Sequence, residues 1–190
     1  MKHTPKENIL KKIRQALAQP VPLPFPQSEG NDSVFQPSKK ELEVEFAEHF
    51  SALLGRFSFC ADENELVEQL QTLIAARKWE KIYCREDALK NSFSTHQFNI
   101  EYYNDLTDCD VSVTSCEALI ARTGSIVMSA AQQSGRTTSV YAPVHICVAY
   151  TNQLMYDIKD ALSLVQKKYG DNFPSLVTLA TGPSRTADIE

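Results

Sequence analysis

The sequence predicts an α/β protein with three α/β/α layers around a mostly parallel sheet. In the first half of the chain, helical segments with one hydrophobic stripe alternate with short apolar runs, which is typical of parallel sheets covered on both faces. From Cys109 onward, several apolar runs follow one another with only short polar breaks, which indicates consecutive strands without helices between them. These two patterns together favour an open α/β sheet.

The segment 1–37 is expected to be a unit of its own, followed by an α/β domain over residues 38–190. Thr4 suits a helix N-cap and Pro5 the first helical position, and hydrophobic residues recur behind them at helical spacing. The prolines within 20–26 cannot continue this helix and predict an extended spacer. Such an arm docks on its own domain or on another molecule, and its hydrophobic stripe alone does not choose between them.

Three further helices are predicted. Ser38 followed by Glu41 matches a capping box, and Asp62 followed by Glu65 matches another. The last clear helix is expected over residues 154–169, where hydrophobic residues form one face. With the helix of the arm, we expect about five helices in all.

About seven strands are expected from runs of apolar and β-branched residues. The candidate runs lie around Phe57, Ile82 and Ile100, and then in CDVSVTS, ALIAR, GSIVMSA, HICVAY and SLVTLA.

Composition excludes several classes of protein. The net charge of -5 argues against general nucleic-acid binding, because no basic excess is available to displace phosphate counterions. No apolar run approaches the roughly 20 residues that span a bilayer, and the amino terminus lacks the apolar core of a secretory signal. We therefore expect a cytoplasmic protein. The five cysteines are scattered without a Cys-x-x-Cys pair, which favours buried reduced thiols and makes this chain a poor ligand set for an iron–sulfur cluster.

The end of the chain, TGPSRTADIE, follows an apolar strand and carries groups that suit an anion. Gly182 permits close approach of the backbone, Ser184 and Thr186 offer hydroxyls, and Arg185 offers a planar cation that Asp188 could hold in place. Ligands of α/β sheets gather beyond the carboxyl ends of the strands. We expect a phosphate or carboxylate site here, with an ordinary capped turn and a surface arginine as the alternative.

The middle of the chain offers a second candidate segment. Glu117 comes just after a strand and could act as a general base or nucleophile, or be a solvated loop acid. Thr123, Gly124 and Ser125 form a tight reversal that we expect to meet the chain end at the same sheet edge. Arg136, in a later loop, would add a second cation or remain solvated.

His145 and Cys147 share a face of one predicted strand, so a metal pair is conceivable. Two ligands fall short of the usual zinc set, and a hydrogen-bonded core histidine is the favoured interpretation. The sequence has no P-loop, no Gly-x-Ser-x-Gly and no Gly-x-Gly-x-x-Gly after a strand, so kinase, hydrolase and dinucleotide-binding functions lack their usual motifs.

The ordered segments ALIARTGSIVM, PVHICVAY and TGPSRTADIE resemble the LUD-domain family of lactate-utilisation protein C (LutC/YkgG), with GPSRTADIE the most specific part. The resemblance covers most of the chain, and it implies a NagB/RpiA/CoA-transferase-like fold. It also implies a component of an iron–sulfur complex that oxidises L-lactate to pyruvate. In that complex LutA-like and LutB-like partner subunits carry the clusters, and this chain binds none.

Family members continue past TADIE into another strand and a His-Gly-Pro segment, which this sequence lacks. We therefore expect either a shortened chain or a lost part of the site, and a sheet edge that could pair with another copy of the chain.

Two alternatives to the subunit role stay open. One is a free-standing enzyme of the CoA-transferase or sugar-phosphate isomerase type. In it Glu117 would be the base or nucleophile, and Arg185 would bind the phosphate or carboxylate of the substrate. The other is a non-catalytic assembly module that binds protein through the amphipathic arm and the sheet edge.

Overall fold

The computed structural model describes residues 5–18, 37–38 and 40–182. The chain divides between Pro37 and Ser38 into two units, which are described separately. The boundary lies where the sequence predicts the arm to meet the α/β domain.

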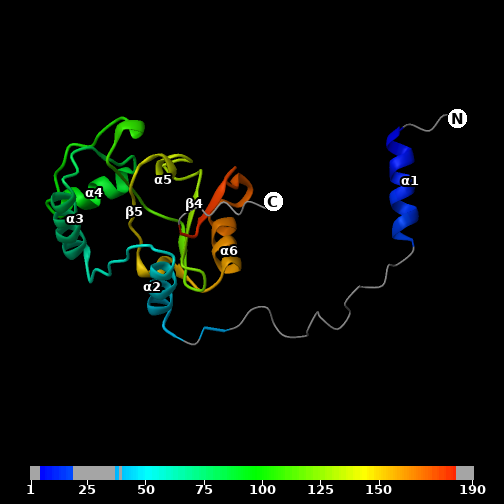
Figure 1. Cartoon of the computed structure of the whole chain (residues 1–190), viewed down its shortest axis with the longest axis horizontal. Coiled ribbons are helices and arrows are strands. Elements are labelled where there is room, and N and C mark those ends of the chain that lie inside the picture. The colour runs from blue at the N-terminus through cyan, green and yellow to red at the C-terminus, as the bar shows by residue number, and fades with distance from the viewer. Residues whose placement is uncertain (1–4, 19–36, 39, 183–190) are drawn as a thin grey trace. The chain divides into compact units, whose positions relative to one another are not determined.

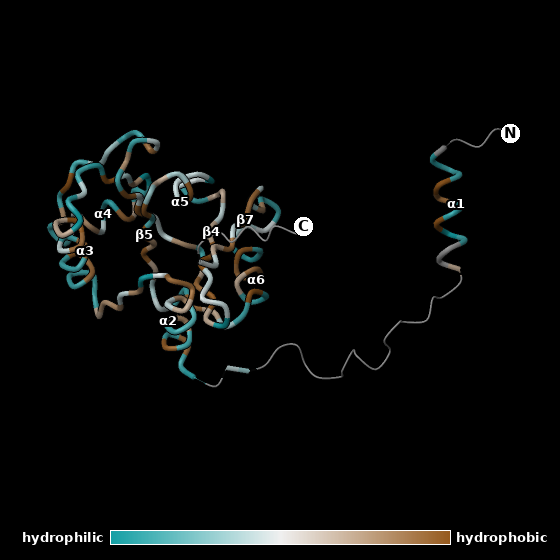
Figure 2. Tube along the Cα trace, in the orientation of Figure 1, coloured by the Kyte–Doolittle hydropathy of each residue, from teal (hydrophilic) through white to brown (hydrophobic). Residues whose placement is uncertain are grey.

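The first unit contains the helix α1 (Pro5–Leu17), which begins at Pro5 as predicted. Its hydrophobic residues Ile9, Leu10 and Ile13 are exposed, and the alternation of hydrophobic and hydrophilic residues along it is visible in Figure 2. Thr4 and the proline spacer lie outside the described residues.

The second unit holds the remaining helices and the strands (Figure 1). Its helices are α2 (Leu42–Ala52), α3 (Glu63–Arg77), α4 (Asp87–Thr95), α5 (Thr138–Tyr141) and α6 (Ile158–Tyr169). Its strands are β1 (Ile82–Tyr83), β2 (Val111–Thr114), β3 (Ala118–Ile120), β4 (Ser125–Ser129), β5 (His145–Cys147), β6 (Leu154–Met155) and β7 (Val177–Ala180).

The strands form two sheets that the chain joins directly. The first sheet is parallel, in the order β1-β2-β5. The second is mixed, in the order β6-β3-β4-β7, with β3 and β6 parallel and with β4 antiparallel to both β3 and β7. Only residues 115–117 separate β2 from β3, and residues 148–153 connect β5 to β6. The pairing of β2 with β5 therefore continues as the pairing of β3 with β6.

Helices cover both faces of the second sheet, as a three-layer protein requires. Ile126 and Met128 on β4 face α2, where Phe46 is buried against them. Val127, between them, points to the other face and packs with Val165 of α6, because successive side chains of a strand alternate between faces. The predicted α/β class with helices on both faces is confirmed.

The first sheet has a separate hydrophobic core under α3 and α4. Figure 2 shows β5 as a mostly hydrophobic stretch beside these helices. On the other face, Ser112 of β2 donates a hydrogen bond of 2.8 Å to the carbonyl oxygen of Thr138 in α5. Among the described residues, no helix is long and apolar enough to cross a membrane.

One capping prediction is confirmed and one is wrong. The Asp62 side chain accepts a hydrogen bond of 2.9 Å from the backbone N–H of Glu65 and caps α3. The predicted box at Ser38 does not form, because the hydroxyl of Ser38 donates to the side chain of Glu45 at 2.7 Å and α2 begins only at Leu42.

Two predicted strands are absent from the described residues. The run around Phe57 forms no ladder, and the Phe57 ring is 40% exposed. The run around Ile100 makes a single backbone bond to β1, from Tyr103 N–H to the Ile82 carbonyl at 2.8 Å, which is too little for a strand. Apolar composition predicted a strand in each case, but a strand also needs a neighbour with which to pair.

The predicted helix over residues 154–169 begins later. Leu154 and Met155 form β6 instead, since β3 pairs with them, and α6 starts at Ile158. The Asp157 side chain caps that helix by accepting from the N–H of Lys159 at 3.1 Å.

Candidate functional site

The reversal between β3 and β4 lies beside the end of β7. The β4–β7 ladder pairs Ile126 with Ala180, so the residues just beyond it, Ser125 and Thr181, are neighbours. Their hydroxyl oxygens lie 2.7 Å apart, and the Thr123 hydroxyl lies 2.7 Å from that of Ser125. We call this set, with Gly124 and Gly182, the hydroxyl end.

The hydroxyl end has an unused proton. Its three hydroxyls carry three protons and share two hydrogen bonds with one another, so one O–H has no acceptor among the described residues. This O–H belongs to Thr181 when Thr123 donates to Ser125 and Ser125 donates to Thr181. Ser125, in the middle, is buried, whereas Thr181 is exposed. In that arrangement, a carboxylate or phosphate oxygen can reach the Thr181 donor from solvent.

The hydroxyl end is fastened to α2. Gly124 has a φ of +63°, and a Cβ there would lie 2.6 Å from the backbone nitrogen of Phe50. The Nδ1–H of His49 donates a hydrogen bond of 2.8 Å to the carbonyl of Ala121. Glycine is needed at this position because the turn combines a left-handed backbone with close approach to the helix.

Glu117 lies at the opposite end of the β3–β4 hairpin. Its side chain is 1% exposed and pairs with the Nζ of Lys168 at 2.7 Å. It also accepts hydrogen bonds from the hydroxyls of Ser129 at 2.5 Å and Tyr169 at 2.7 Å. We call these four residues the carboxylate end.

The partners of Glu117 set its charge. Burial is the largest single influence and raises the pKa of the carboxyl, but the bonds from Lys168, Ser129 and Tyr169, together with the charge of Lys168, outweigh it and leave the pKa lowered. The carboxylate is therefore ionised at neutral pH. With both oxygens engaged, it is arranged as a buried counter-ion rather than as a group ready to take a proton.

Arg136 lies near the carboxylate end, not near the hydroxyl end. Its guanidinium donates to the hydroxyl of Ser175, which precedes β7, whereas Thr181 follows β7. The length of β4, roughly 14 Å, separates the two ends of the ladder. The structure thus brings Thr123, Ser125 and Gly182 together and leaves Glu117 and Arg136 apart from them. The predicted ligands Ser184, Arg185, Thr186 and Asp188 lie outside the described residues.

Several residues around these sites were not predicted from the sequence. Lys168 and Tyr169 hold Glu117 from the end of α6, more than 50 positions along the chain, so no local pattern links them. Arg122 adjoins the hydroxyl end, where its Nε donates to Asp157 at 2.6 Å. Its place in the quoted ALIARTGS run could have marked it as a candidate cation.

His145 is half-buried in β5, and its Nε2 lies 2.8 Å from the hydroxyl of Thr114. Among the described residues no group of three or more His, Cys, Asp or Glu could hold a metal ion. The interpretation of His145 as a hydrogen-bonded histidine is confirmed. All five cysteines are free thiols, as predicted, but Cys60 and Cys147 are only partly buried.

Several known proteins are similar to this chain in sequence. The lactate utilization protein C of Bacillus licheniformis is 29% identical over 83 residues, which cover 43% of this chain and 35% of that protein. An uncharacterised protein of Neisseria meningitidis is 32% identical over 84 residues, 44% of this chain and 36% of its own length. The matches thus span about a third of these relatives. The lactate utilization protein C 1 of Bacillus mycoides is 24% identical over 173 residues, 80% of this chain and 73% of that protein.

A solved structure has the same fold. The crystal structure of a DUF162 family protein from Deinococcus radiodurans superposes with a TM-score of 0.62 and 17% identity, covering 77% of this chain and 90% of that one. The sequence model of the LUD-domain family matches residues 44–190, which include both ends of the β4–β7 ladder. The chain therefore belongs to the LUD-domain family.

Proposed function

We propose that this chain is a cytoplasmic component of a lactate-utilisation system and binds a small carboxylate at the hydroxyl end. The three bonded hydroxyls carry the proposal, because they leave one O–H without an acceptor among the described residues, and Thr181, at one end of the row, is exposed. Gly182 has a φ of +75° and is exposed. The names of the Bacillus relatives supply the ligand class, a 2-hydroxy or 2-oxo acid.

The proposed partners are LutA-like and LutB-like subunits that carry iron–sulfur clusters. In that division of labour the oxidation of lactate takes place on the cluster-bearing subunits, and this chain holds or delivers the carboxylate. The free-standing enzyme alternative is less well supported, because both carboxylate oxygens of Glu117 already accept bonds from Lys168, Ser129 and Tyr169.

The subunit role is tested by co-expressing the full chain with the two cluster-bearing subunits. We expect them to co-purify, and we expect lactate oxidation with an artificial electron acceptor to fall when the chain is omitted. Unchanged oxidation together with a lack of association would contradict the subunit role.

The carboxylate site is tested separately by titrating L-lactate and pyruvate into the purified chain in a calorimeter. Thr181→Val removes the hydroxyl and keeps the shape, so we expect affinity to fall roughly tenfold, the usual effect of losing a hydrogen bond to a charged group. Thr178→Val, on β7 itself, is the matched control and should leave affinity unchanged. Equal affinity in the two variants, or no binding by the wild type, would overturn this site and leave the subunit role to its own test.

A further inference from the structure

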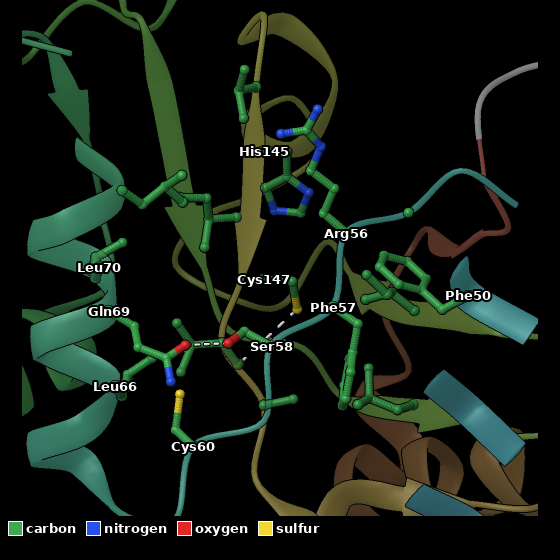
Figure 3. Close-up of a pocket in the computed structure, with 18 of the residues that line it drawn as sticks. Phe50, Arg56, Phe57, Ser58, Cys60, Leu66, Gln69, Leu70, His145 and Cys147 are labelled. Atoms are coloured by element: carbon green, nitrogen blue, oxygen red, sulfur yellow. Dashed lines mark hydrogen bonds between the residues drawn. The ribbon is translucent and has the colours of Figure 1, made fainter. Parts of the chain in front are cut away.

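A cleft of about 810 Å³, lined by no residue of the hydroxyl end, lies between α2, α3 and β5 (Figure 3). Its walls are largely hydrophobic and aromatic, with side chains that include Phe50, Phe57, Leu70 and Trp79. Sites for small molecules typically measure about 300–1,000 Å³ and are lined in this way. L-lactate, with three carbons, would leave most of such a cleft empty, so the ligand of the hydroxyl end does not account for it.

Two arginines give the cleft a positive charge. Arg56, in the segment after α2, and Arg77, at the end of α3, both line it, and no carboxylate is among the lining residues. Neither guanidinium makes a hydrogen bond or ion pair with another residue in the part of the chain that the structure describes. Figure 3 shows the Arg56 side chain extending in the direction of His145.

A neighbouring hollow carries the opposite charge. It measures about 430 Å³, shares the wall around Phe57 and Cys147 with the cleft, and is bordered by Glu43, Asp62 and Glu63. These carboxylates repel an anionic group from one side while the arginines attract it to the other. The charges therefore orient a ligand that has one acidic end.

His145 adds a hydrogen-bond acceptor to the cleft. The Thr114 hydroxyl donates its proton to the carbonyl of Ser115 at 2.9 Å, so the imidazole Nε2 must carry the hydrogen that bonds the Thr114 oxygen. Nδ1 is then an acceptor. Burial lowers the pKa of His145 to about 4, against the opposing charge of Glu86, so the ring is neutral at physiological pH.

We propose that this cleft binds a small molecule with a flat aromatic or apolar body and one acidic group, held with the acid beside Arg56 and Arg77. The apolar wall buries the body, and the two guanidinium groups, which hydrate weakly and match planar acids, bind the acid. The site is separate from the hydroxyl end, and its occupant is larger than lactate.

The test uses two dyes that share one ring system. 8-Anilinonaphthalene-1-sulfonate carries a sulfonate, and N-phenyl-1-naphthylamine is its neutral counterpart. Trp79 is the only tryptophan in the sequence and lines the cleft, so quenching of its fluorescence reports binding at this place. We expect saturable quenching by both dyes, with the sulfonate binding more tightly.

Variants separate charge from apolar burial. The double variant Arg56→Ala/Arg77→Ala should weaken binding of the sulfonate roughly tenfold and leave the neutral dye unchanged, because two accessible ion pairs are lost. Arg85→Ala removes an exposed arginine that does not line the cleft and should change neither affinity. Ser58→Phe, which narrows the cleft from its rim, should weaken both dyes, and thermal melts check that each variant is folded.

Several results of the dye titrations would overturn the proposal. They are an absence of saturable quenching by either dye, equal affinity for the two dyes, and an effect of the double variant no larger than that of Arg85→Ala. Loss of dye binding as protein concentration rises would mean that a second copy of the chain covers the cleft, which would also overturn it. None of these outcomes bears on L-lactate binding at the hydroxyl end.

Discussion

The two ends of the β4–β7 ladder are both polar, but they differ in whether their hydrogen bonds are complete. At the carboxylate end, Lys168, Tyr169 and Ser129 bond both carboxylate oxygens of Glu117. At the hydroxyl end, the three bonded hydroxyls of Thr123, Ser125 and Thr181 leave one proton without an acceptor among the described residues. A complete buried network stabilises the fold, whereas an incomplete one at the surface is available to a ligand.

The largest expected effect is at the hydroxyl end. Gly124→Ala should lower the free energy of unfolding by about 3 kcal/mol or more, since the new Cβ meets the backbone of α2 and the backbone stays left-handed. Gly135→Ala is the matched control, because Gly135 has a φ of +69° and nothing within 4 Å of its Cβ position, and it should cost only about 1 kcal/mol. Urea unfolding measures both. Similar losses in the two variants would show that the turn does not depend on α2.

The second effect concerns the carboxylate end. Glu117→Gln should lower the free energy of unfolding by about 2 kcal/mol at neutral pH, because it removes the charge that Lys168 and two hydroxyls stabilise. Glu68→Gln changes an exposed carboxylate whose side chain makes no hydrogen bond among the described residues, and it should have almost no effect.

The pH dependence sharpens this prediction. The pKa of Glu117 is lowered in the folded protein, so its stabilising contribution is present above the pKa of the unfolded chain. It is lost as the pH falls through the folded-state pKa. The stability gap between wild type and Glu117→Gln should therefore close in acid, as urea unfolding at a series of pH values will measure. A gap that stays constant with pH would mean that packing, not charge, explains the loss.

The smallest expected effect is that of Arg136→Ala. The Arg136 side chain is exposed and bonds only Ser175 among the described residues, so the free energy of unfolding should change by less than about 0.5 kcal/mol. L-lactate affinity should also be unchanged, because Arg136 lies at the far end of the ladder. A clear loss of affinity in calorimetry would place the ligand at the carboxylate end instead.

Sequence patterns predicted the elements whose signals are local. The β3–β4 hairpin and β7 follow from short apolar runs with polar breaks, and the start of α3 follows from Asp62 and Glu65. The runs around Phe57 and Ile100 carry the same local signal but lack a strand with which to pair. Strand formation depends on that distant neighbour, which composition does not reveal.

The sequence predicted only some of the contacts in the candidate site. The meeting of Ser125 with Thr181 could be expected from strand order at one sheet edge. The partners of Glu117 could not, because Lys168 reaches it from α6 across a fold that no local pattern defines. Arg56 and Arg77 both line the cleft for the same tertiary reason, although they come from two separate segments.

The central claim is that the hydroxyl end, and not the carboxylate end, receives the carboxylate. Titration of isotope-labelled protein with L-lactate, followed by NMR, tests it most directly. We predict saturable shifts of the backbone amides of Thr181 and Gly182 with the amides of Lys168 and Tyr169 unmoved. Saturable shifts at Lys168 and Tyr169 with Thr181 and Gly182 unmoved would contradict it.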